Sequence, residues 1–162
     1  MANQKTESQI ILTAKSIHVQ QTLLSLGVDF QVRQLNESTR TAKEAADALG
    51  CNLGQIVKSL VFRAGETPIL VLVSGSNRVH ENLLEDLIGH PIKRAQADFV
   101  RQYTGYSIGG VAPVGHPNPL PTFVDEDLLR YEEVWAAAGG PFAVFGCPPT
   151  FLATLGTVTT IC

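Results

Sequence analysis

The sequence has few of the residues and runs that mark the common specialised classes of protein. It holds three cysteines, Cys51, Cys147 and Cys162, and no CxxC pair, so neither a disulfide framework nor a zinc site is indicated. The longest purely apolar run, 69–73, is far too short to cross a bilayer, and the polar start MANQKTESQ lacks the layout of a signal peptide. We therefore expect a cytoplasmic protein with no membrane partner.

Short catalytic and cofactor motifs are also missing. There is no GxSxG elbow, no P-loop and no HExxH, and GGVAPVG does not match GxGxxG placed between a strand and a helix. The four histidines, His18, His80, His90 and His116, include no close pair with metal-ligand spacing. The sequence therefore gives no reason to expect a metal ion or another cofactor, and we expect none.

Positive charge is not in excess either. The formal net charge is -3, so a nucleic-acid partner would have to be bound by a local basic patch and not by the field of the whole protein. Hydrophobic residues make up 44% and charged residues 17%, which is ordinary for a compact domain. With no repeat or linker in the chain, we expect residues 1–162 to form a single domain.

The hydrophobic pattern predicts an α/β domain. The clearest local signal is the capping box from Thr41 to Glu44, which predicts a helix over 41–49 that ends at Gly50. The apolar segments QIVKSLVF and PILVLVS, at 55–62 and 68–74, predict a β-hairpin at the centre of a sheet. Further helices are expected at 8–26, 79–88, 98–103 and 148–155, and further strands at 28–35, 91–95, 122–124, 133–137, 141–145 and 157–161.

Lys58 lies on an apolar face of the first hairpin strand. Alternation puts it on the same face as Ile56, Leu60 and Phe62. One interpretation is a strand-end lysine whose stem packs while its ammonium reaches water. The other is a cation held at the floor of a cleft, where it would bind an anionic group such as phosphate.

The segment 105–117, GYSIGGVAPVGHP, combines glycines that free the backbone with prolines that fix it. This composition is typical of a tight structural turn and also of a shaped binding loop. His116 lies within it, although a single loop histidine is more often structural than catalytic. Ser76, in the SGSN turn at 74–77, is a candidate for anion binding because such turns precede helix N-termini.

Taken together, QIVKSLVF, the VSGS turn and SIGGVAPVGHP resemble the YbaK/ProXp family of freestanding aminoacyl-tRNA deacylases. That family is similar to the editing domain inserted in bacterial prolyl-tRNA synthetases. The resemblance covers about residues 27–161. It implies a mixed, mostly antiparallel sheet that curls into a barrel-like core with helices around it.

The resemblance also implies hydrolysis of the ester that joins a small wrong amino acid, such as alanine, to tRNA-Pro, with prolyl-tRNA synthetase as a second partner. Lys58 matches the family lysine, expected to hold the 3′-terminal nucleotide, and Gly110 is assigned with it to catalysis. The rest of the GxxxP loop is expected to bind the aminoacyl group, with His116 and Ser76 as further substrate-binding candidates; the loop residues are Gly109, Val111, Ala112 and Pro113. Related enzymes use the adenosine 2′-hydroxyl in the attack.

The residue types suit this chemistry, because an activated ester needs a placed oxygen and donors for the developing oxyanion but no strong protein nucleophile. Ser59 follows the lysine where some relatives carry asparagine, which leaves the amino acid removed open. Two alternatives also remain at this point. One is a non-catalytic module that binds tRNA or a synthetase, and the other is a small-nucleotide binding domain built on the 74–77 turn.

Overall fold

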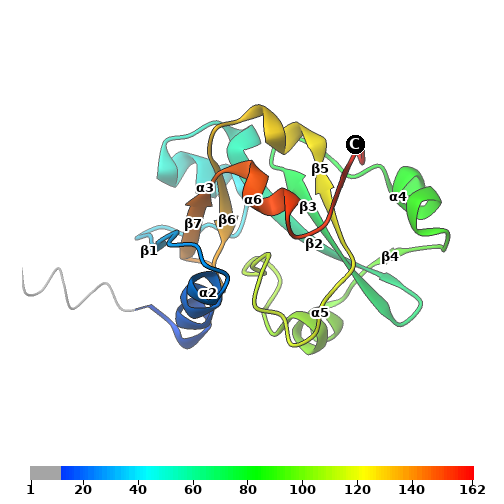
Figure 1. Cartoon of the computed structure of the whole chain (residues 1–162), viewed down its shortest axis with the longest axis horizontal. Helices are drawn as coiled ribbons and strands as arrows, with labels where there is room; N and C mark the ends of the chain where they lie inside the picture. The colour runs from blue at the N-terminus through cyan, green and yellow to red at the C-terminus, as the bar shows by residue number, and fades with distance from the viewer. Residues whose placement is uncertain (1–11) are drawn as a thin grey trace, which may run out of the picture.

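A long antiparallel hairpin forms the middle of the fold. It consists of β2 (Ile56–Ala64) and β3 (Thr67–Ser74), paired from Val57↔Ser74 to Ala64↔Thr67, in a computed structural model that describes residues 12–162 (Figure 1). Gly65 turns the chain with φ of +62°. Residues 69–74 of β3 are all buried, as expected for a strand covered on both faces.

The other strands extend this hairpin into a sheet in the order β1-β7-β6-β2-β3-β5-β8, with β4 also paired to β2. Four pairings are antiparallel (β1–β7, β6–β7, β2–β3 and β2–β4) and three are parallel (β2–β6, β3–β5 and β5–β8). The bounds are β1 (Val32–Gln34), β4 (Lys93–Arg94), β5 (Thr122–Asp125), β6 (Val134–Ala137), β7 (Ala143–Cys147) and β8 (Thr157–Thr159).

The mixed sheet agrees with the prediction, but the barrel-like closure does not. β1 and β8 stand at opposite ends of the strand order and do not pair, so residues 12–162 contain no closed barrel. The predicted strand over 28–35 is also shorter than expected, at Val32–Gln34. The side chain of Gln20 explains the difference, because it binds the carbonyl oxygen of Phe30 and the N–H of Val32.

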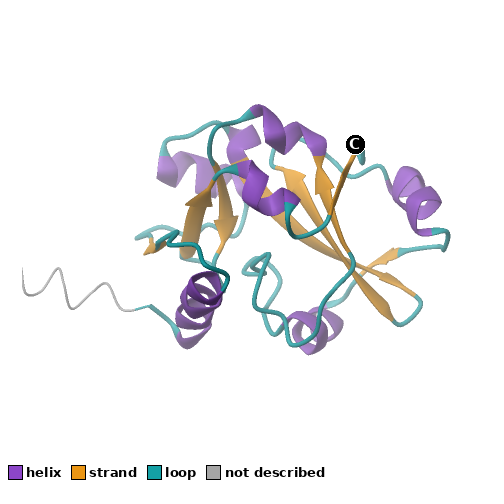
Figure 2. Ribbon diagram, viewed as in Figure 1, coloured by secondary structure: helices purple, strands orange, loops and turns teal. Residues whose placement is uncertain are grey.

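Helices cover both faces of the sheet (Figure 2). They are α2 (Ala14–Ser25), α3 (Ala42–Leu49), α4 (Glu81–Ile88), α5 (Ala97–Thr104) and α6 (Pro149–Ala153), with short 3-10 turns η1 (Leu53–Gln55) and η2 (Glu126–Arg130). The helix predicted at 41–49 is confirmed: Thr41 Oγ1 accepts a hydrogen bond from Glu44 N at 3.1 Å, and Gly50 follows with φ of +68°. Residues 8–11 of the first predicted helix lie outside the described residues.

The core has two main parts, one on each face of the hairpin. On one face, Val57 and Val61 pack with residues of α2, α5 and the loop after α5. On the other face, Phe62 and Val73 pack with Leu84 of α4. No helix within residues 12–162 is long and apolar enough to cross a membrane.

One edge of β2 is interrupted. β6 pairs with Ile56 and Val57, and β4 pairs with Phe62 and Arg63. Between them, Val61 O accepts a hydrogen bond from Ala95 N, but within residues 12–162 no strand pairs with residues 58–60 on this edge. The gap leaves a short length of strand edge open in the middle of the sheet.

Candidate functional site

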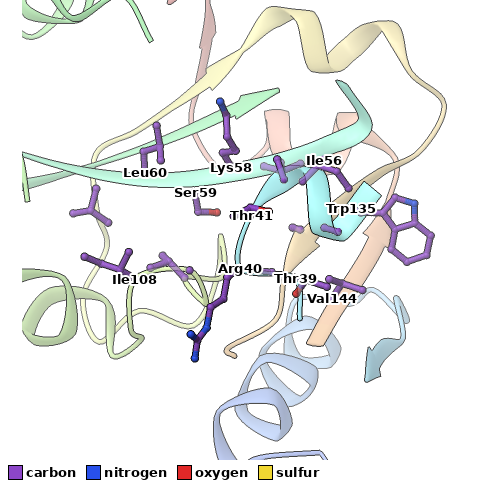
Figure 3. A pocket seen from close by; sticks show the side chains of 18 of the residues that line it. Thr39, Arg40, Thr41, Ile56, Lys58, Ser59, Leu60, Ile108, Trp135 and Val144 are labelled. Atoms are coloured by element: carbon purple, nitrogen blue, oxygen red, sulfur yellow. The ribbon is translucent and has the colours of Figure 1, made fainter. Parts of the chain in front are cut away.

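The open edge of β2 forms one wall of a cavity of about 360 Å³ (Figure 3). The opposite walls come from residues 39–42 at the start of α3, from the loop around Ile108, and from β6 and β7. Arg94 of β4 and Val100 of α5 contribute to the remaining side. Most of the lining side chains are aliphatic, so the cavity suits a small, largely apolar group.

Three hydroxyl groups line this cavity, and two of them already have partners. Thr39 Oγ1 donates to Pro141 O at 2.9 Å, and Thr41 Oγ1 accepts from Glu44 N. Ser59 Oγ is buried and has no hydrogen-bond partner within residues 12–162. It alternates with Val57 and Val61 on the strand, so it lies on the face of β2 that meets the loop and not on the face of Lys58.

Lys58 lines the cavity, but its side chain leaves β2 on the side opposite Ser59 (Figure 3). Its Nζ donates a hydrogen bond to the carbonyl oxygen of Asn77. The predicted shared face with Leu60 is confirmed, since both side chains point the same way. The ammonium is therefore held beside the turn at 74–77, across the strand from the loop at 109–113.

Both cations and acidic groups lie near Lys58. Burial lowers the pKa of Lys58, and the nearby cations Arg94 and Arg78 lower it further, while Cys162 and Asp125 act in the opposite direction. Lys58 thus lies near both cations and the carboxylate of Asp125, and phosphate binding by it stays a prediction.

The glycine loop, residues 105–117, lies against the cavity through Ile108, Gly109 and Val111. Gly109 has φ of +88°, and a Cβ added to it would lie 3.7 Å from the Cγ of Arg40. The N–H groups of Gly109 and Val111 have no hydrogen-bond acceptor recorded within residues 12–162. The N–H of Ile108, which also belongs to the cavity lining, likewise has no acceptor within residues 12–162, so Ile108, Gly109 and Val111 are the candidate loop donors for a ligand.

Gly110 is buried behind the cavity and not part of its lining. Its N–H donates to Ser107 O at 2.9 Å, and its carbonyl accepts from Gly139 N at 3.1 Å. An added Cβ would lie 3.0 Å from the Cα and N of Gly140. Gly110 thus fixes the loop against the β6–β7 turn, which is a different contribution from donating to the substrate.

Ala112 and Pro113 are buried residues of the loop and do not line the cavity. His116 lies behind them, with Nε2 2.8 Å from Ala112 O and its ring edge-on to Tyr106 at 6.0 Å between centroids. Burial lowers the pKa of His116, the contact with Ala112 O raises it, and His18 lowers it. His116 therefore holds the shape of the loop from outside the cavity.

Ser76 is exposed and lies outside the cavity, with its Oγ 3.3 Å from Ser74 Oγ. The turn around it is crowded by carboxylates, because the Asn77 side-chain amide donates to Asp125 Oδ2 at 2.9 Å and to Asp127 Oδ2 at 2.7 Å. Negative charge at this turn disfavours the small-nucleotide hypothesis based on residues 74–77.

Sequence reasoning missed Ile108 and Thr39 as cavity residues and did not assign the hydroxyl of Ser59 to the site. Ser59 could have been found by the argument used for Lys58, because it is a polar residue between Val57 and Val61 on the other face of the strand. Thr39 and Ile108 lie in loops, where no periodicity indicates the direction of a side chain. Within residues 12–162, no group of three His, Cys, Asp or Glu residues is placed to hold a metal ion.

Comparison with known proteins identifies a family model and several proteins to which this chain is similar. A family model described as "Aminoacyl-tRNA editing domain" matches residues 36–155. YwhH of Bacillus subtilis is 30% identical over 109 residues, covering 67% of this chain and 69% of that protein. EbsC of Enterococcus faecalis, named a candidate Cys-tRNA(Pro)/Cys-tRNA(Cys) deacylase, is 26% identical over 64% of this chain and 65% of its own length.

A longer protein and a solved structure agree with this. The proline–tRNA ligase of Maridesulfovibrio salexigens is 32% identical over 98 residues, 60% of this chain but 17% of the ligase. A crystal structure described as that of a candidate trans-editing enzyme for prolyl-tRNA synthetase superposes with a TM-score of 0.89 at 47% identity, over 93% of this chain and 98% of that one.

Proposed function

Because this chain belongs to the aminoacyl-tRNA editing domain family (YbaK/ProX), whose members are editing hydrolases, we propose that it removes alanine or a similarly small amino acid from mischarged tRNA-Pro in trans. The observation that carries this proposal is the cavity of about 360 Å³ at the open edge of β2. It provides a partly open, largely apolar site for an aminoacyl group, lined by residues of the loop and by Arg94.

Selection by size follows from the walls of this cavity. In this proposal the backbone at Gly109 and the buried side chains of Val57 and Val111, which line the cavity, limit the bulk of the group that it accepts. One methylene in an apolar pocket is worth only about 1 to 3 kcal/mol, or about 10- to 200-fold in rate. We therefore expect graded preference among small side chains and exclusion of the proline ring.

Hydrolysis requires little from the protein beyond placement. Water attacks the ester carbonyl carbon, the bond to the ribose oxygen breaks, and that oxygen leaves as a hydroxyl carrying a proton. In this proposal the N–H groups of Gly109 and Val111 stabilise the oxyanion that develops, since they lack protein acceptors. Gly110 contributes by fixing the loop that carries them, and Ala112, Pro113 and His116 support it from behind.

The tRNA partner is expected to bind along the cations next to the cavity. Lys58, Arg78 and Arg94 would hold the phosphate of the 3′-terminal nucleotide. Arg94 also lines a neighbouring groove of about 530 Å³ with Arg63, His90 and Lys93. Because Arg94 belongs to both hollows, we propose that the acceptor strand runs from the cavity past Arg94 into this groove. A synthetase partner would then act on the rest of the tRNA.

The test is to incubate the purified protein with tRNA-Pro charged separately with alanine, 2-aminobutyrate, serine, cysteine or proline, and to follow the loss of each ester. We expect hydrolysis of the small amino acids and survival of prolyl-tRNA. Binding of the tRNA with no ester loss would show a non-catalytic module. Equal hydrolysis of prolyl and alanyl esters would contradict selection by the cavity.

A further inference from the structure

We infer that Ser59 is a specificity-determining residue, whose hydroxyl pairs with a hydroxyl or thiol on the β-carbon of the amino acid to be removed. The inference rests on the proposed function and adds the substrate class. Seryl and cysteinyl esters would be preferred to an apolar ester of the same size.

The inference rests on which hydroxyl groups of the cavity already have a hydrogen-bond partner in the protein. Thr39 and Thr41 also bring hydroxyls to the lining, but each has a protein partner: Thr39 Oγ1 donates to Pro141 O, and Thr41 Oγ1 accepts from Glu44 N. Ser59 Oγ is the buried side-chain polar atom that has no partner among residues 12–162. A buried hydroxyl without a partner is costly, and its cost is removed when a bound group supplies one.

The position of Ser59 makes a ligand the natural partner. It lies in the part of β2 where neither β4 nor β6 covers the strand edge. Val61 O points to that edge, since it accepts from Ala95 N, and backbone groups two residues apart on a strand point the same way. The carbonyl of Ser59 therefore also points into the gap, and it can accept from a hydroxyl or thiol proton.

Ser59 Oγ has almost no surface of its own open to solvent. A substrate atom reaches it when the serine side chain turns to another χ1 rotamer, which serine does readily because it is small and unbranched at Cβ. Its neighbours on the same face of β2, Val57 and Val61, offer no competing polar contact. The rotamer change thus exchanges an unpaired hydroxyl for a paired one.

A matched pair of substrates tests this directly. Serine and 2-aminobutyrate differ by a hydroxyl in place of a methyl group, so their esters on tRNA-Pro have nearly the same size. We expect the wild-type protein to have a higher kcat/KM for the seryl ester. In Ser59→Ala the ratio of the two kcat/KM values should fall by about 5- to 150-fold, as expected for the loss of one buried hydrogen bond.

Two variants act as controls. Thr39→Val removes a cavity hydroxyl that is already occupied, so it should lower the melting temperature and leave the seryl to 2-aminobutyryl ratio unchanged. Ser59→Cys keeps the size of the side chain with a weaker hydrogen bond, and it should give an intermediate ratio. It also allows the ratio of the two kcat/KM values to be measured if Ser59→Ala fails to fold.

Different results would contradict the proposed function and the inference about Ser59. If the wild-type protein hydrolyses no ester, the proposed function is wrong. If it hydrolyses small esters but Ser59→Ala lowers all of them equally, the hydroxyl serves a group common to every substrate, such as the α-amino group, and the inference about Ser59 is overturned. An unchanged ratio with unchanged rates overturns it as well.

Discussion

Lys58 and Ser59 are consecutive residues of β2 that face opposite sides of the sheet. A single step along the strand separates the ammonium beside Asn77 from the hydroxyl over the cavity. The 3′ end of a charged tRNA has the same division, with a phosphate on one side of the ribose and the aminoacyl ester on the other. The strand edge between the two residues would lie against the ribose.

Replacing Lys58 tests the phosphate side of this arrangement. Lys58→Ala should lower kcat/KM for alanyl-tRNA by at least about 100-fold, because it removes the cation next to the terminal phosphate. Lys58→Arg should not restore it, since a planar guanidinium fills the space beside Asn77 differently from an ammonium. The measurement is single-turnover deacylation, with circular dichroism to confirm that each variant folds.

Arg101→Gln is the matched control for Lys58. Arg101 is exposed on α5 and pairs with Asp98 at 2.6 Å, outside the cavity lining. The change removes one positive charge away from Lys58 and Asn77. Full activity in Lys58→Ala would overturn the role given to the lysine.

His116 gives a prediction for pH dependence. Burial lowers its pKa in the folded protein, so the unfolded chain binds the proton more tightly. Stability should therefore fall as the pH drops below the unfolded value of about 6.5, and level off below the folded pKa. His116→Gln should show a shallower fall between pH 7 and pH 5, by at most about 1.4 kcal/mol per pH unit.

Urea unfolding at several pH values measures this difference. His90→Gln, which changes an exposed histidine, serves as the control. Identical pH profiles for wild type and His116→Gln would show that His116 does not link protonation to folding.

At the scale of elements, the sequence predicted the regular parts well. The helix at 41–49 and the hairpin around Gly65 carry their own signals, a capping box and two apolar runs, and both are confirmed. The strand expected at 28–35 is mostly absent, because a side chain from α2 binds backbone groups that a neighbouring strand would otherwise use. Such a tertiary contact leaves no trace in local periodicity.

The glycine loop shows the same limit. Its composition predicted a shaped segment, but composition could not tell which glycine turns the chain and which packs. Gly105, Gly109 and Gly115 have positive φ, whereas Gly110 does not and is needed because Gly140 lies against it. Substitutions at Gly110 are therefore opposed by close packing and not by strain from a positive φ.

A pair of glycine substitutions tests this contact. Gly110→Ala should destabilise the protein by about 1 to 3 kcal/mol and reduce deacylation, because its Cβ would push the loop away from the β6–β7 turn. Gly140→Ala should be nearly neutral, since nothing lies within 4 Å of a Cβ at that position. Thermal unfolding and deacylation rates measure both. Equal effects of the two changes would contradict the packing argument.

For the molecule as a whole, the net charge of -3 makes tRNA binding depend on a few local cations. Arg94 stands between the cavity and the neighbouring groove. Arg94→Gln should weaken tRNA binding and reduce the slope of log K against log salt by about one. Filter binding across a range of salt concentrations measures the slope.

Arg101→Gln is the control for this charge, because Arg101 is exposed on α5 and pairs with Asp98 at 2.6 Å. It should leave the slope as in the wild type. A slope that does not change in Arg94→Gln would place the acceptor strand elsewhere on the surface.

The residues that line the cavity come from distant parts of the chain, and this determines the order in which its walls form. The hairpin of β2 and β3 is local and can form as soon as it is synthesised, but the wall made by β6 and β7 is not complete until residue 144. The parallel pairing of β2 with β6 joins segments about 80 residues apart, and such contacts form late. A chain still on the ribosome thus has its central hairpin early, but the walls of the cavity come together only after residue 144 has been made.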